Sequence, residues 1–124
     1  MQSDRLPHPP VNDTPFTIDV ERRDSAAIVR VSGSCTMEVS EKLGVCIKGL
    51  ASEPLNPIVL ELSALDFIES SGLGGIVAGY LRARRNHGEI RLVAPSKPIL
   101  MLLELTRLTQ LFGVYPSIDE ALSI

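Results

Sequence analysis

One stretch of the chain limits the possible folds more than any other. Residues 58–62 read Ile-Val-Leu-Glu-Leu, an almost wholly apolar run that is typical of a strand buried on both faces of its sheet. Sheets of that kind are built from parallel strands joined by helices. A turn with two serines follows at residues 69–72, and beyond it apolar residues recur at helical spacing. This order predicts an α/β domain.

Strand patterns and helix patterns alternate along the rest of the chain, as in domains with a mostly parallel core sheet. Strands are predicted at residues 16–22, 26–32, 58–62, 90–93 and 112–115. Helices are predicted at residues 37–51, 73–85, 97–108 and 118–122. The short turn between the first two strands favours an antiparallel hairpin. We predict a mostly parallel central sheet with this N-terminal hairpin, flanked by about four helices.

Capping and breaking residues set the expected limits of these elements. Gly33 is expected to end the second strand, and Gly88 to be the left-handed residue after the second helix. Thr36, Ser96 and Ser117 are the expected N-caps of the other three helices.

Composition excludes several classes of function. Of the 124 residues, 44% are hydrophobic, which suits one domain with a single core. A net charge of −3 provides no basic field for nucleic acid, and no apolar run approaches the roughly 20 residues of a membrane span. Residues 1–15, with four prolines among polar residues, are predicted to be a flexible tail without a secretion signal. Residues 16–124 are the predicted domain.

The two cysteines, Cys35 and Cys46, form no C-x-x-C pair and have no histidine at metal-binding spacing. We expect a free loop thiol at Cys35 and a free core thiol at Cys46, as in a cytoplasmic protein. No cofactor and no metal site are predicted.

The candidate functional site is the turn formed by Glu69, Ser70, Ser71 and Gly72. The first backbone N–H groups of a helix lack intrahelical partners, and the helix dipole there favours negative charge. A serine in this place serves as a helix cap, as a nucleophile or as a phosphorylation site. From spacing alone the helix cap is favoured, because serine is a preferred N-cap residue.

The patterns of catalytic and nucleotide-binding turns are not met here. A nucleophile elbow needs glycine two residues before the serine, where Ile68 stands, and the histidines are His8 and His87, away from the turn. A dinucleotide fingerprint needs glycine where Val77 stands, and a P-loop needs a lysine. The residues of the turn therefore do not predict an enzyme.

Two glycines and one apolar run lie outside this turn. Gly75 and Gly79 lower helix propensity, and we expect them to allow close packing of the helix against the sheet. The run at residues 100–103 is expected to be mostly core. Its apolar residues cannot all share one helix face, so some are expected to be exposed and available to a partner.

Two parts of the chain together resemble the signature of STAS domains, in particular the stand-alone anti-sigma factor antagonists of bacteria. The first part comprises residues 58–63 and 65–74, with the serine–glycine turn. The second comprises residues 94–96, 105–108 and 112–122, with the ending Phe-Gly-Val-Tyr-Pro-Ser-Ile-Asp-Glu-Ala-Leu. The resemblance extends from residue 16 to the C-terminus and implies a STAS-like fold.

The resemblance also implies a switch. Proteins of that family bind an anti-sigma factor that is also a serine kinase, and binding releases a sigma factor. The kinase phosphorylates the first serine of the turn, here Ser70, which ends binding, and a PP2C-type phosphatase restores the protein. Glu69, Ser71 and Gly72 would shape the surroundings of the phosphoacceptor. The resemblance implies as partner-binding residues Ser34, Cys35, Thr36, Leu73 and Gly74.

The chain departs from the family pattern at two places. Glu69 stands where Asp is usual, and the segment 33–36 lacks the acidic residue that is common there. The longer side chain of Glu69 moves the carboxylate by about 1.5 Å, which bears on how efficiently the kinase modifies Ser70. The second departure bears on the contacts with the partner and so on the choice of partner. Two other functions remain open: an adaptor subunit of a transporter or signalling scaffold that is never phosphorylated, and a nucleotide-binding module that uses the glycine turn.

Overall fold

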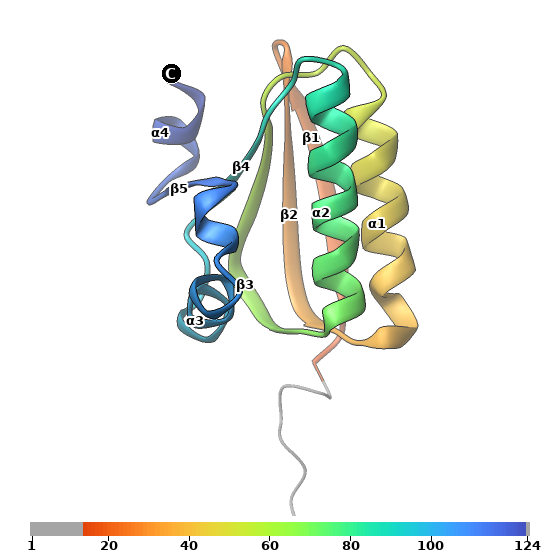
Figure 1. The fold of residues 1–124 in the computed structure, drawn as a ribbon, viewed down its shortest axis with the longest axis vertical. Coiled ribbons are helices and arrows are strands. Elements are labelled where there is room, and N and C mark those ends of the chain that lie inside the picture. Colours follow the sequence, from red (N-terminus) through yellow and green to blue (C-terminus); the bar gives the residue numbers. More distant parts are fainter. Residues whose placement is uncertain (1–13, 124) are drawn as a thin grey trace, which may run out of the picture.

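Five strands form one mixed sheet in the order β1-β2-β3-β4-β5 in the computed structural model, which describes residues 14–123 (Figure 1). The strands are β1 (Thr17–Arg23), β2 (Ala26–Cys35), β3 (Ile58–Ile68), β4 (Ile90–Val93) and β5 (Gly113–Tyr115). The helical elements are α1 (Met37–Ala51), α2 (Ser70–Arg85), α3 (Lys97–Leu105), the 3-10 turn η3 (Leu108–Gln110) and α4 (Ile118–Leu122). All but the last two residues of the predicted tail lie outside the described residues.

The pairing of the strands confirms the predicted topology. β1 pairs antiparallel with β2, so that Thr17 lies opposite Ser32 and Arg23 opposite Ala26. The pairs β2–β3, β3–β4 and β4–β5 are all parallel. The result is the expected α/β fold with an N-terminal hairpin and a mostly parallel sheet.

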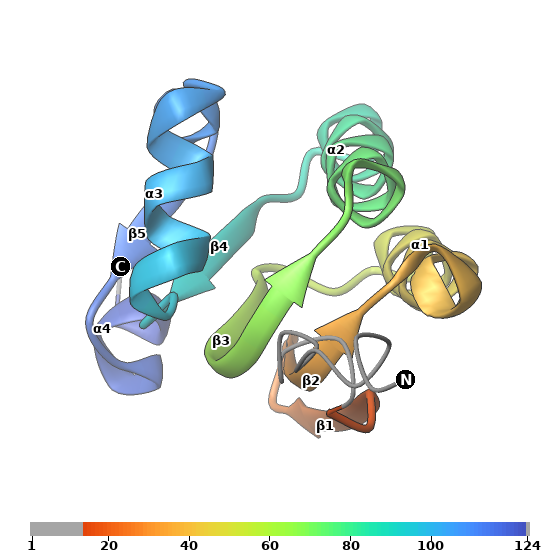
Figure 2. The ribbon, with the colours of Figure 1, turned by 90° about the horizontal axis from the view of Figure 1, so that it is seen from below.

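The sheet is covered on both faces around β3. Figure 2 shows α1, α2 and α3 over one face and α4 over the other. Leu60 of β3 lies in the larger apolar cluster beneath α1, α2 and α3, and Val59 lies in the smaller cluster that includes Ala121 of α4. Both β3 side chains are fully buried, which confirms the prediction from the apolar run.

Two strands run further than predicted, and both extensions lead toward the candidate site. β2 does not end at Gly33 but continues to Cys35, with a shift in its register against β3 between Gly33 and Ser34. Gly33 has a φ of +87°, and a Cβ there would lie 1.8 Å from the Pro15 carbonyl oxygen. Glycine therefore permits a bulge and not a break. β3 likewise extends to Ile68.

The glycines of α2 serve helix–helix packing more than the expected packing against the sheet. A Cβ on Gly75 would lie 3.1 Å from the Gly44 Cα of α1, and one on Gly79 would lie 2.2 Å from the Ile47 Cγ2. Only a more distant contact from Gly79, at 3.6 Å, reaches the sheet, at Ile90. The two helices thus approach closely along these residues, which fixes α2 and its first turn in place.

The helix ends agree only in part with the expected caps. Gly88 is not the left-handed residue: His87 is, with a φ of 63°, and the Gly88 N–H donates to the Ala83 carbonyl at 2.7 Å. The helix thus ends in a Schellman motif whose left-handed residue lies one position earlier than predicted. At α3, the left-handed Arg107 separates the helix from η3, so the helix ends before residue 108.

The three expected N-caps lie at their predicted positions. Ser117 also caps in the full sense, because its hydroxyl oxygen accepts from the Glu120 N–H at 3.2 Å. Thr36 and Ser96 make no such side-chain bond. The Ser96 hydroxyl instead donates to the Leu65 carbonyl of β3 at 2.6 Å, which ties α3 to the central strand.

Candidate functional site

The candidate site is the junction between β3 and α2. Glu69 is the only residue between them, and its extended backbone, with φ of −83° and ψ of 166°, makes it the N-cap. The Glu69 N–H donates to the Cys35 carbonyl at the end of β2, at 3.0 Å. The Glu69 carbonyl accepts from Gly72 at 2.9 Å and from Leu73 at 3.1 Å. The first turn of α2 is therefore anchored to the ends of two neighbouring strands.

The favoured interpretation of the serines as helix caps is wrong. Because β3 extends to Ile68, the cap position falls on Glu69, whose side chain makes no capping hydrogen bond. Ser70 and Ser71 are the first two residues of the helix, and both are exposed. Neither serine occupies the N-cap position.

Gly72 allows this first turn to lie against the strand ends. A Cβ at this position would lie 2.7 Å from Ile68 Cγ1 and 2.9 Å from Cys35 Sγ. Gly72 and Leu73 are buried, and Leu73 belongs to the main core. The turn thus has an inner side that packs on the strands and an outer side that carries the serines.

The thiol of Cys35 lies beneath this turn. Cys35 is fully buried in β2, so the prediction of a loop thiol is wrong, because the strand continues past Gly33. Burial, and to a lesser extent the Glu69 carboxylate, raise the pKa of Cys35 to about 11. Cys46 is only half-buried, and burial raises its pKa while Arg22 opposes the change. Both cysteines are free.

The residues implied as partner contacts lie together near the carboxyl ends of β2 and β3, but they differ in exposure. Ser34 is 3% exposed and Cys35 is fully buried. These two side chains, like that of Leu73, therefore lie in the interior beneath the exposed surface. We call the outer surface the serine face. It comprises Thr36, Glu69, Ser70, Ser71 and Gly74, which are exposed or half-buried. A partner-binding role for these residues stays a prediction.

One residue beside the serine face was not predicted. Met37, the first residue of α1, follows Thr36 directly and is 68% exposed. The helical spacing gave no signal for this exposure, because Met37 stands three and seven residues before the buried Ser40 and Gly44 of the same helix. An apolar side chain thus lies next to the polar serine face.

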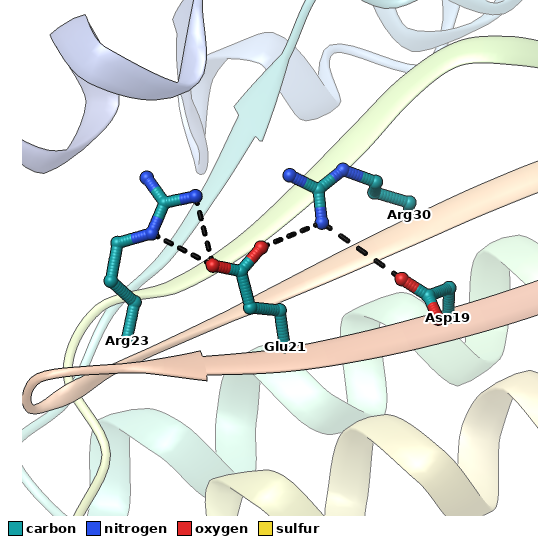
Figure 3. Close-up of polar contacts among 4 residues, drawn as sticks. All are labelled: Asp19, Glu21, Arg23 and Arg30. Atoms are coloured by element: carbon teal, nitrogen blue, oxygen red, sulfur yellow. Dashed lines mark hydrogen bonds and ion pairs between the residues drawn. The ribbon is translucent and has the colours of Figure 1, made fainter.

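A second polar cluster lies on the hairpin, on the face turned away from α1 and α2 (Figure 3). The Glu21 carboxylate contacts the guanidinium groups of Arg23 and Arg30, each at 2.9 Å, and Arg30 also lies 3.9 Å from Asp19. Hydrogen bonds from Arg23 and then from Arg30 lower the pKa of Glu21. These charges are mutually paired, which is typical of a solvated strand pair.

The described part of the chain, residues 14–123, contains no group of three or more His, Cys, Asp or Glu side chains arranged to hold a metal ion. None of its helices has the length and apolar character needed to cross a membrane.

The model of the STAS domain family matches residues 17–121. The chain belongs to the STAS domain family. This STAS domain is 28% identical over 107 residues to the anti-sigma F factor antagonist of Paenibacillus polymyxa. The alignment covers 86% of this chain and 92% of that relative.

Solved STAS structures have the same fold. An anti-sigma factor antagonist from Mycobacterium paratuberculosis matches with a TM-score of 0.79 and 30% identity, over 88% of this chain and 92% of that one. The Bacillus cell fate determinant SpoIIAA in its phosphorylated form matches with a TM-score of 0.68, over 86% and 96% of the two chains. At 18% identity, this second likeness shows the fold alone.

Proposed function

We propose that this STAS domain is an anti-sigma factor antagonist that binds an anti-sigma factor through the serine face, and that phosphorylation of Ser70 ends this binding. The names of the relatives support the first part of the proposal, because the Paenibacillus and Mycobacterium proteins are both anti-sigma factor antagonists and align over most of their length. The position of Ser70 supports the second part.

The observation that carries the switch is the exposure of Ser70 at the first position of α2. A phosphate adds a charge of about −1.5 to −2 and strong hydrogen-bond acceptors. The free N–H groups and the dipole of a helix N-terminus accommodate such a group. Because Ser70 is exposed on an anchored turn, the phosphate changes the surface and leaves the fold intact.

Because Glu69 is acidic, phosphorylation of Ser70 is expected to weaken partner binding and not to strengthen it. Its carboxylate already lies beside Ser70, so a phosphate places a second negative group on the same small surface. A partner surface that fits the unmodified serine then has to desolvate the new charge or be repelled by it. The expected outcome is loss of binding without unfolding.

The partners follow from this assignment. The anti-sigma factor is the proposed serine kinase for Ser70, a PP2C-type phosphatase is the proposed enzyme that removes the phosphate, and the cytoplasm is the proposed location. The domain itself is the substrate of this cycle and has no catalytic role in the proposal.

Intact-mass spectrometry of the protein from its own cells, followed by peptide mapping, tests the modification. We expect one phosphate on the peptide that contains Ser70. Ser70→Ala should lose this phosphate, while Ser71→Ala, a matched change at the next exposed serine, should keep it. A protein that is unphosphorylated under all growth conditions, yet still binds its partner when Ser70 is replaced by Asp, would favour the adaptor function.

A further inference from the structure

Helix α3 has two apolar sides, and only one of them is used by the core. Ile99 and Leu103 are 3% and 1% exposed and pack inward. Met101 and Leu105 are 55% and 80% exposed. The exposed residues are four positions apart, so they lie on the same side of the helix, one turn from each other. This second apolar stripe has no role in the folded domain.

The stripe borders a groove. Pro98, Met101, Leu102 and Leu105 form the side contributed by α3, and the end of β3 forms the other side, with Phe67 and Ile68. The volume of the groove is about 400 Å³. Among its described lining residues the only ionisable one is Asp66. Large apolar side chains gathered around an open groove are a common mark of a protein-binding surface.

The groove lies directly beside the serine face. Ile68 lines the groove and is followed at once by Glu69, the N-cap of α2. Figure 1 shows α3 and the first turn of α2 at the same end of the molecule, on either side of the end of β3. A protein that covers Ser70 therefore reaches the groove without crossing any other element.

We propose that this groove binds an apolar segment of the anti-sigma factor and forms the second half of the contact surface. This inference rests on the proposed function. Charge selects the kind of segment: Asp66 in the lining and Glu69 at the near end are both acidic, so the segment carries apolar side chains next to a basic one. The groove supplies affinity, and Ser70 supplies the switch.

Site-specific photo-cross-linking of the full-length protein in its own cells tests this surface. A photoreactive aromatic residue replaces Met101 in one strain, Gly74 of the serine face in a second, and Leu81 in a third. A Cβ on Gly74 meets nothing within 4 Å, so the probe fits there without a clash. Leu81 is 50% exposed and lies about two turns further along α2 than Gly74, which makes it the matched control.

We expect the probes at Met101 and Gly74 to capture the same anti-sigma factor, identified by mass spectrometry, and the probe at Leu81 not to capture it. Capture from Gly74 but not from Met101 overturns the groove and leaves the proposed function standing. A Met101 probe that cross-links a second copy of this chain, or residues 1–13 of its own chain, also overturns the groove. No anti-sigma factor on any probe overturns both proposals.

Binding measurements with the captured anti-sigma factor give the size of the contribution. The double variant Met101→Ser with Leu105→Ser should raise the Kd by about tenfold or more, as for a pair of central apolar contacts. Leu81→Ser should stay within about twofold of the parent protein. All three side chains are exposed, so thermal unfolding is expected to remain similar. Equal Kd values for the two variants would contradict the groove.

Discussion

The last turn and the first turn of helix α2 differ in their charges and in their hydrogen bonds. In the last turn, Arg82, Arg84 and Arg85 place cations where the helix dipole is negative. Arg82 donates to the Ser52 hydroxyl oxygen at 3.0 Å, and Arg84 donates to the Tyr80 hydroxyl at 2.9 Å. The last carbonyls of the helix also accept from the backbone N–H groups of residues 86–88, so this end is satisfied within the domain itself.

The first turn has no corresponding side-chain hydrogen bond or compensating charge within the described residues. It contains no acidic residue, and the N-cap Glu69 makes no side-chain capping bond. Ser70 and Ser71 are exposed on it, above an inner side that Gly72 packs tightly on the strands. One helix therefore has a closed, basic end and an open end suited to negative charge. The rigid support and the exposed surface therefore belong to the same turn.

The largest expected effect concerns the thiol beneath the open end. Because Cys35 is fully buried and its pKa is raised to about 11, we expect it to react with iodoacetamide at pH 8.5 about a hundredfold more slowly in the folded protein than in the unfolded chain. The half-buried Cys46 should react first. Peptide mapping over time measures both rates. Equal rates for the two cysteines would mean that the first turn opens readily.

The same pKa shift gives a pH dependence with a definite sign. Burial disfavours the thiolate, so the folded pKa of Cys35 lies above the ordinary value of 9.0. The stability that this provides is fully present below about pH 9 and is lost as the pH rises through about 11. Urea unfolding of the parent protein and of Cys35→Ala across that window should show a steeper decline for the parent.

A charged side chain added near the first turn of α2 should weaken binding, while the same change in a remote helix should not. Gly74 and Gly49 are both exposed helical glycines whose Cβ would meet nothing within 4 Å. We expect Gly74→Arg to weaken binding of the anti-sigma factor by about thirtyfold or more, because a long charged side chain enters the serine face. Gly49→Arg, near the C-terminal end of α1, should leave the Kd within about twofold.

The inner side of the first turn should respond through stability. Gly72→Ala forces a Cβ to within 2.7 Å of Ile68, so we expect a loss of about 1–3 kcal/mol in the free energy of unfolding. Gly74→Ala, two positions further on in open space, should instead raise it by about 0.5–1 kcal/mol. Urea denaturation measures both. Equal effects in the two variants would contradict the two-sided description of this turn.

The smallest expected effect belongs to the closed end. Arg82→Ala removes one hydrogen bond to Ser52 and one favourable charge at the helix C-terminus. The free energy of unfolding should fall by about 0.3–1 kcal/mol, and the Kd for the anti-sigma factor should not change. A clear loss of binding would show that the arginine end also touches the partner.

The regular spacing of apolar residues along the sequence was enough to predict most of the fold. The apolar run of β3 and the helical spacings of α1 and α2 follow from which side chains must be buried, and they lie where predicted. The glycines that were expected to end a strand or a helix predicted its exact boundary less well. Gly33 permits a bulge within β2, and Gly88 follows a left-handed His87, because glycine tolerates several backbone states that only the tertiary context selects.

The candidate site was predictable as a location but not in its detail. The serines of the turn indicated a candidate site between a strand and a helix, yet which residue caps the helix depended on how far β3 extends. The burial of Cys35 depended on the bulge in β2 in the same way. The exposed stripe of Met101 and Leu105 depended on how α3 is rotated over the sheet, which its run of leucines leaves undetermined.

The most direct test of the account compares the Kd of the anti-sigma factor for the unmodified protein and for the same protein carrying one phosphate on Ser70, by titration calorimetry. We expect binding to be at least about thirtyfold weaker for the phosphorylated form, with an unchanged circular dichroism spectrum. A phosphorylated protein that binds within about twofold of the unmodified one would contradict the switch at the open end of α2.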